Sequence, residues 1–281
     1  MQGMDTQMCV PDTHDNIYAS ASNAPSGSHG KSSQDRGASH KKENWRISPG
    51  NIVDLSHMLS PHIPLFPKDP ALRLDTAHTF EDEGYYDCTL FMIEHAGTHV
   101  DAPLHFDENG GAIHDIPVEQ LISPLVIVDV KDRVSRDENT TVHPDDLLSW
   151  ENRHGTIPDG AVVIMNSGWH SRYSDPKQYC NADSQGVYHF PGWGEEAAHF
   201  LMDERNAVGI GVDTFSLDSG ANSTTTGATF PAHNAWLGGG GWGLESVANL
   251  DAVPASGAML IVGMPNLCQG TGMPARLMAA F

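Results

Sequence analysis

Basic residues are scarce in this 281-residue chain, which has 15 Lys and Arg against 36 Asp and Glu and a formal net charge of −21. A surface this acidic repels phosphate groups, so we expect neither nucleic acid nor an anionic membrane as a partner. The acidic excess either serves solubility or reflects a saline habitat. The expected partner is therefore a small-molecule substrate.

Cysteines are few and far apart, and no two form a C-x-x-C pair, which argues against a thiolate zinc site and a disulfide framework. They are Cys9, Cys88, Cys180 and Cys268. The chain also lacks an apolar run of about 18 residues that could span a membrane, and it shows no secretory signal at its start. We expect isolated thiols and a cytoplasmic location. A G-x-S-x-G nucleophile elbow is absent as well, which disfavours a serine hydrolase.

Composition divides the chain into two parts. Residues 1–48 are rich in Ser, Asn, Asp, Gly and His and contain almost no apolar clusters. Such a segment cannot bury enough surface to offset its ordering entropy, so we expect a flexible N-terminal extension. Residues 49–281 carry the apolar patterns of a folded domain.

Short apolar and β-branched runs dominate this second part. They predict strands at 52–56, 90–100, 125–130, 161–166, 208–212 and 258–262. Helical patterns are fewer and predict helices at 142–154 and 194–206. The sequence therefore indicates a single α/β domain with a sheet-rich core.

The segment from His95 to His105, HAGTHVDAPLH, carries the chemistry. In an extended strand, residues 95, 97, 99 and 101 share one face while their apolar neighbours pack on the core. That face presents two imidazoles and a carboxylate, from His95, His99 and Asp101, which suit a divalent metal with open positions. Gly97 between them leaves space for an ion or substrate, and His105 follows on a loop where it can act as a base. Isolated histidines are usually structural, but this register indicates a metal site.

The segment matches the signature H-x-G-T-H-x-D-x-P-x-H at every fixed position. In this the chain resembles the metal-dependent hydrolases of the cyclase family, which includes bacterial kynurenine formamidase and isatin hydrolase. Similar stretches are D-L-S-H at 54–57, S-G-W at 167–169, F-P-G at 190–192 and G-I-G-V-D-T at 209–214. The resemblance implies a swivelling β/β/α cyclase-like fold, a zinc or manganese cofactor, and a homodimer or homotetramer.

The resemblance also implies roles for individual residues. The three motif ligands would bind the primary ion, and His105 would be the catalytic acid and base. In the formamidase branch, a His and a Glu twelve residues apart hold a second zinc, and His233 and Glu245 have that spacing here. The isatin hydrolase branch uses one manganese and lacks this Glu, yet the length and loops of this chain resemble that branch. The resemblance therefore leaves open whether the site binds one metal ion or two.

The implied reaction is hydrolysis of a C–N amide bond in a small cyclic amide or aryl formamide. Phe66, Tyr85 and Tyr86 flank the motif segment and form either an aromatic substrate wall or part of the core. A metal-dependent cyclase or dehydratase is the alternative enzyme, and a non-catalytic metal-binding protein is the third hypothesis. Product analysis separates the two enzymes, because hydrolysis adds one water to the substrate.

Overall fold

The computed structural model describes residues 51–281, and the predicted extension at residues 1–48 lies outside the described residues. The strands are β1 (Ile52–Asp54), β2 (Arg73–His78), β3 (Asp87–Phe91), β4 (His99–Asp101), β5 (Ile122–Asp129), β6 (Thr141–Val142), β7 (Val162–Asn166), β8 (Gly192–Trp193), β9 (Gly209–Val212), β10 (Trp242–Glu245), β11 (Ala258–Gly263), β12 (Gly272–Pro274) and β13 (Arg276–Ala280). The α-helices are α1 (Lys131–Val134), α2 (Pro144–His154), α3 (Pro176–Cys180), α4 (Glu195–Arg205), α5 (Gly220–Ser223) and α6 (Pro231–Trp236).

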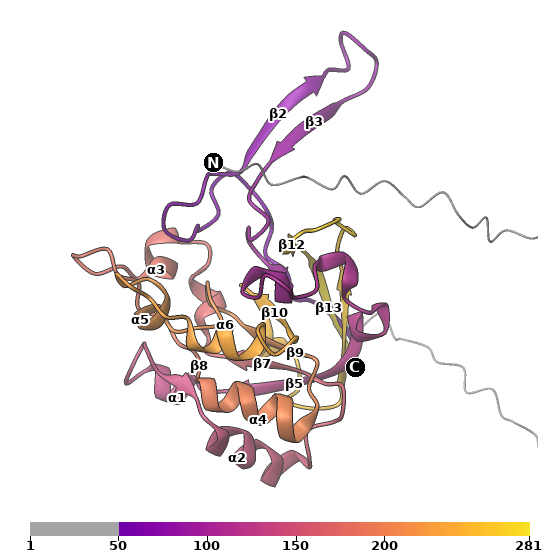
Figure 1. Cartoon of the computed structure of the whole chain (residues 1–281). Helices are drawn as coiled ribbons and strands as arrows, with labels where there is room; N and C mark the ends of the chain where they lie inside the picture. The colour runs from indigo at the N-terminus through magenta and orange to yellow at the C-terminus, as the bar shows by residue number, and fades with distance from the viewer. Residues whose placement is uncertain (1–50) are drawn as a thin grey trace, which may run out of the picture. The chain divides into compact units, whose positions relative to one another are not determined.

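One nine-stranded sheet organises the domain, in the order β1-β13-β11-β5-β7-β9-β10-β4-β12 (Figure 1). The central strands β5, β7, β9 and β10 run parallel to one another. The strands beyond them, including β4 and β12, pair in antiparallel fashion. The predicted sheet-rich α/β architecture is confirmed.

Both faces of the sheet are buried at its central strands, which explains the continuous apolar runs there. On β5, Val126 and Val128 belong to one apolar cluster, together with Leu201 of α4. Leu125 and Ile127, the alternate residues of the same strand, belong to a second cluster. Helices α2 and α4 lie side by side along one face of the sheet (Figure 1).

The predicted strand at residues 90–100 is wrong. Strand β3 ends at Phe91 and β4 begins only at His99. Between them Gly97 has a φ of +65°, a left-handed conformation that interrupts an extended path. A Cβ at Gly97 would lie 2.6 Å from Leu59 Cδ2. This glycine therefore permits a turn and the packing of Leu59, where the sequence predicted clearance for an ion.

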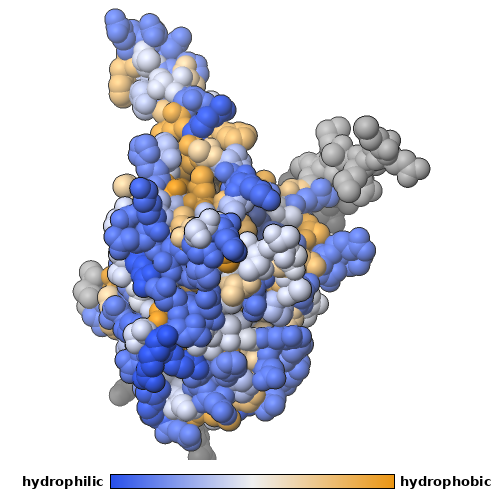
Figure 2. Space-filling view, turned by 90° about the vertical axis from the view of Figure 1, so that its left-hand side faces the viewer, coloured by the Kyte–Doolittle hydropathy of each residue, from blue (hydrophilic) through white to orange (hydrophobic). Residues whose placement is uncertain are grey.

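Strands β2 and β3 form a separate hairpin that extends away from the nine-stranded sheet (Figure 1). Several large apolar side chains on it are exposed, and Figure 2 shows hydrophobic surface along the hairpin and at its base. These side chains are Leu74, Phe80, Tyr85, Tyr86, Leu90 and Phe91.

No helix in residues 51–281 is both long and apolar enough to cross a membrane. Cys88 and Cys180 are free thiols, whereas Cys9 lies outside the described residues. Cys268 is disulfide-bonded, so the expectation of isolated thiols is wrong for that residue. Spacing along a sequence does not fix which cysteines meet in the folded chain.

Candidate metal centre

Two of the predicted ligands lie on strand β4, which is flanked by β10 and β12 in the sheet. His99 and Asp101 are two residues apart on this strand and therefore share one face. On β10, Glu245 lies directly opposite His99 and Gly243 lies opposite Asp101. On the other side of β4, Gly272 of β12 lies opposite Asp101. The sheet thus brings a distant carboxylate to the motif ligands and places glycines around Asp101.

A first ligand group consists of the three motif residues. His95 Nδ1 lies 2.7 Å from Asp101 Oδ1, and His99 Nε2 lies 3.1 Å from the same oxygen. His95 belongs to the turn before β4, yet its ring still converges on Asp101. The structure therefore brings the three predicted ligands together, although only two of them lie on a strand.

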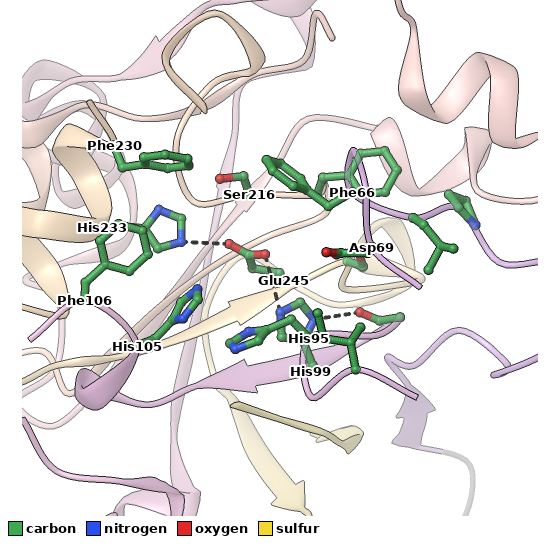
Figure 3. Close-up of a pocket in the computed structure, with 16 residues that line it drawn as sticks. Phe66, Asp69, His95, His99, His105, Phe106, Ser216, Phe230, His233 and Glu245 are labelled. Atoms are coloured by element: carbon green, nitrogen blue, oxygen red, sulfur yellow. Dashed lines mark hydrogen bonds and ion pairs between the residues drawn. The ribbon is translucent and has the colours of Figure 1, made fainter. Parts of the chain in front are cut away.

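A second group shares Asp101 with the first. Figure 3 shows the contact between His233 and Glu245 of this group. His233, from α6, places Nε2 at 3.2 Å from Glu245 Oε1 and at 3.7 Å from Asp101 Oδ2. The other Glu245 oxygen, Oε2, lies 3.4 Å from His99 Nε2. In each group the candidate ligand atoms lie within 4.8 Å of one another. Asp101 thus directs one oxygen to each group.

Hydrogen bonds from the far side of each imidazole orient the two buried histidines. His99 Nδ1 donates to the carbonyl oxygen of Gly97 at 2.8 Å. His233 Nδ1 donates to Asp218 Oδ2 at 2.7 Å, and the backbone N–H of His233 also donates to that carboxylate. These contacts leave Nε2 of both rings as the atom that faces the carboxylates, as in metal-binding histidines.

The position of His95 depends on a glycine and a threonine from the C-terminal part of the chain. A Cβ at Gly272 would lie 2.4 Å from His95 Cε1, so only glycine leaves room for this ring. His95 Nε2 lies 3.1 Å from Thr271 Oγ1, which in turn donates to Glu94 Oε2 at 2.6 Å. Neither Gly272 nor Thr271 was among the residues predicted from the sequence.

The buried charges of the cluster alter its acid–base properties. Burial lowers the pKa of His99, but the carboxylates of Asp101 and Glu245 outweigh it and raise that pKa to about 9. Burial also disfavours a charged His233, yet the same carboxylates and Asp218 raise its pKa well above the ordinary value. Two buried carboxylates thus attract positive charge, which protons or a metal ion can supply.

The residues fit a divalent metal ion on their own geometry. His99 Nε2 and Asp101 Oδ2 are buried, and within residues 51–281 neither atom has a hydrogen-bond partner. Unpaired buried polar atoms are costly unless a ligand satisfies them. An imidazole nitrogen and a carboxylate oxygen are common ligand atoms for zinc and manganese.

His105 stands beside this cluster, at the end of the short 3-10 helix Pro103–His105. Its ring stacks on that of His95, with centroids 4.0 Å apart. Part of the His105 side chain is exposed to the cavity. The protein atoms packed around the ring nevertheless remove water from it, and this desolvation lowers the pKa of His105 to about 4. The His105 imidazole is therefore neutral at pH 7, so one ring nitrogen has a free lone pair and can act as a base in the cavity.

A cavity of about 220 Å³ opens above the cluster, with phenylalanine side chains forming much of its wall (Figure 3). The rings are Phe66, Phe106, Phe215 and Phe230. Phe106 also stacks on His233, with centroids 4.4 Å apart. Pockets for drug-sized ligands measure about 300–1,000 Å³, so this smaller cavity suits one small aromatic molecule.

The structure places the three predicted aromatic residues in two different environments. Phe66 lines the cavity, whereas Tyr85 and Tyr86 lie exposed on the β2–β3 hairpin and do not line it. Phe106 and Phe230 line it but were missed. Phe106 follows His105 directly, which was a usable signal, whereas Phe230 depends on a backbone φ of +47° before α6 that the sequence does not reveal.

The comparisons with known proteins agree with this site. Residues 53–219 match the Cyclase family model, described as "Putative cyclase". The chain is 32% identical to isatin hydrolase from Roseibium aggregatum over 81% of its own length and 90% of that protein. It is 28% identical to kynurenine formamidase from Salinibacter ruber over 54% of its own length and 77% of that protein.

A solved structure of a similar protein shares the fold. Isatin hydrolase A from Labrenzia aggregata, bound to benzyl benzoate, superposes with a TM-score of 0.75 at 34% identity. The match covers 82% of this chain and 93% of that one. The predicted cyclase-like fold is confirmed. By its family model, by these relatives and by its fold, the chain belongs to the cyclase family, as its motif indicated.

Proposed function

We propose that this protein hydrolyses a C–N amide bond in a small aromatic substrate, either a cyclic amide or an aryl formamide. The observation that carries the proposal is the juxtaposition of His105 with the cluster of His95, His99 and Asp101 at the base of a phenylalanine-lined cavity. Relatives named isatin hydrolase and kynurenine formamidase support this substrate class.

Each part of the site has a role in this reaction. A divalent ion held by the cluster would supply Lewis acidity, lowering the pKa of water and polarising the carbonyl group. His105 accepts a proton from the attacking water and returns it to the leaving nitrogen, which departs poorly as an anion. Phe66, Phe106 and Phe230 hold the aromatic ring of the substrate and exclude bulk water from the scissile bond.

The cofactor we propose is zinc or manganese, bound as two ions. His95, His99 and Asp101 would hold the first ion, and His233 and Glu245, together with Asp101, would hold the second. The two Asp101 oxygens, each facing one ligand group, support this arrangement. Elemental analysis of the purified protein tests it, and a stoichiometry that saturates at one ion contradicts the two-ion proposal.

Turnover and product mass test the activity itself. The metal-loaded protein is incubated with isatin and with N-formylkynurenine, and each product is identified by mass spectrometry. A hydrolase adds one water to its substrate. A product that has lost water, or one that has cyclised without gaining water, supports the cyclase or dehydratase alternative. Metal binding without turnover of any compound of this class supports a non-catalytic metal-binding protein.

We also propose that the chain forms a homodimer or homotetramer. Leu74 and Leu90 are paired across β2 and β3, yet they are 58% and 48% exposed. A two-stranded hairpin is marginally stable alone, and covering such apolar side chains stabilises it. Light scattering at micromolar concentration tests the proposal, and a monomer contradicts it.

The cytoplasmic location stays a prediction, which cell fractionation tests.

A further inference from the structure

The cavity contains one acidic side chain that belongs to neither ligand group. Asp69 lines the cavity together with Phe66 and the histidines of the cluster. Figure 3 shows it between Phe66 and the histidine cluster. It comes from the proline-rich segment before β2 and therefore lies outside β4, β10 and α6, which carry four of the five candidate ligands. Asp69 therefore has no role in the reaction as described so far.

A strained turn places Asp69 in the cavity. The backbone N–H of Asp69 donates to the carbonyl oxygen of Phe66 at 3.2 Å, which closes a four-residue turn. Lys68, the third residue of this turn, has a φ of +78°, a conformation that favours glycine. Non-glycine residues held there are strained, and such strain is concentrated at functional sites. The turn directs Phe66 and Asp69 to the same cavity.

The Asp69 carboxylate is half-buried and lacks a partner. Among residues 51–281, no side chain or backbone group forms a hydrogen bond or ion pair with it. Burial raises the pKa of the Asp69 carboxyl, while the nearby His95 and His99 rings oppose that effect. A half-buried acceptor without a donor is costly, and a ligand that brings a donor into the cavity removes this cost.

We propose that Asp69 accepts a hydrogen bond from an N–H group of the substrate and thereby selects N–H amides over their N-alkylated counterparts. This inference rests on the proposed function and narrows its substrate class. An aromatic amide whose ring lies among the phenylalanines and whose amide carbonyl faces the cluster still has its N–H donor to satisfy. Asp69 is the carboxylate of the cavity that metal ligation leaves available.

Isatin and N-methylisatin, which differ only at this nitrogen, are suitable probes. Binding of both compounds to the full-length, metal-loaded protein is measured by calorimetry, and hydrolysis is followed by product mass. The variants are Asp69→Asn, which retains an acceptor oxygen, and Asp69→Leu, which removes it. Asp75→Asn on β2 is the matched control, because Asp75 is exposed and lies outside the cavity. Metal content and circular dichroism show whether each variant is folded.

The wild-type protein and Asp75→Asn should bind isatin about 10- to 100-fold more tightly than N-methylisatin, since a charged acceptor strengthens the hydrogen bond. Asp69→Leu should lose this preference by weakening isatin binding alone, and Asp69→Asn should retain part of it. A wild-type protein that binds both compounds equally overturns the inference, as does one that binds neither. An equal loss for both compounds in both folded variants also overturns it. Selective binding without hydrolysis supports Asp69 as the selector but contradicts the proposed function, so the two failures are distinguishable.

Discussion

Glu245 of β10 stands directly opposite His99 of β4, with Glu245 Oε2 3.4 Å from His99 Nε2. The register of two antiparallel strands therefore joins the motif to a carboxylate from a distant part of the chain. His233 completes this second group from α6.

Removal of the second ligand group should reduce the bound metal by one ion. In Glu245→Gln the side chain keeps its size but loses its charge, so the second ion should be lost while the first stays. Activity should fall by about 10- to 100-fold. Plasma mass spectrometry measures the stoichiometry, and His233→Ala should give the same result. Unchanged metal content in both variants contradicts the assignment.

Replacement of His105 should separate metal binding from catalysis. His105→Ala removes the proton carrier but none of the ligands, so the metal content should stay at the wild-type value. Turnover should fall by about 10²–10⁴-fold, which is typical of a lost general acid or base. Steady-state kinetics on metal-loaded protein measure this effect. A variant with full turnover would falsify the role given to His105.

Metal affinity should rise with pH. The pKa of His99 is raised to about 9, and that of His233 is also raised, so both rings are protonated at pH 7 in the metal-free protein. Metal binding must displace these protons. Affinity should therefore increase between pH 6 and pH 8 by up to about tenfold per pH unit for each proton displaced. Competition with a chelator measures it, and a pH-independent affinity contradicts the prediction.

His57 should make the protein less stable in acid. Burial and the nearby His170 lower the pKa of His57 to about 4, from 6.5 in an unfolded chain. The unfolded state therefore binds more protons between these values, so stability is complete above pH 6.5 and falls as pH decreases toward 4. His57→Phe can keep the stacking on Tyr173, whose ring centroid lies 3.6 Å away. Urea unfolding at pH 4.5, 5.5 and 7 should show a weaker pH dependence in the variant.

Gly272→Ala should disrupt the first ligand group. The added Cβ would lie 2.4 Å from the His95 ring, which must then move away from Asp101. We expect a destabilisation of about 1–3 kcal/mol and weaker metal binding. Gly263→Ala on β11 is the matched control, because its Cβ would meet only Arg276 O at an ordinary 3.5 Å. Thermal unfolding and metal titration of both variants measure the difference, and equal behaviour contradicts the prediction.

Local patterns predicted much of the fold. The apolar runs that became β5, β7 and β9 were located within a few residues of their observed ends, because strands buried on both faces require continuous apolar sequence. The run that became β11 was located as well, although only alternate residues of this strand are buried. Helices α2 and α4 were located for a similar reason, since their periodicity is also local. The strand predicted over 90–100 failed at Gly97, where a left-handed residue permits a turn that the apolar pattern does not record.

The sequence by itself determined the chemistry of the motif, because the spacing of His95, His99, Asp101 and His105 is short enough for the local backbone to hold them near one another. The tertiary structure alone decided the remaining contacts. The pairing of Glu245 with His99, the space that Gly272 leaves for His95, and the entry of Asp69 into the cavity all depend on strand register and turn geometry. Such contacts join residues far apart in the chain, and only the packing of the whole sheet determines which of them meet.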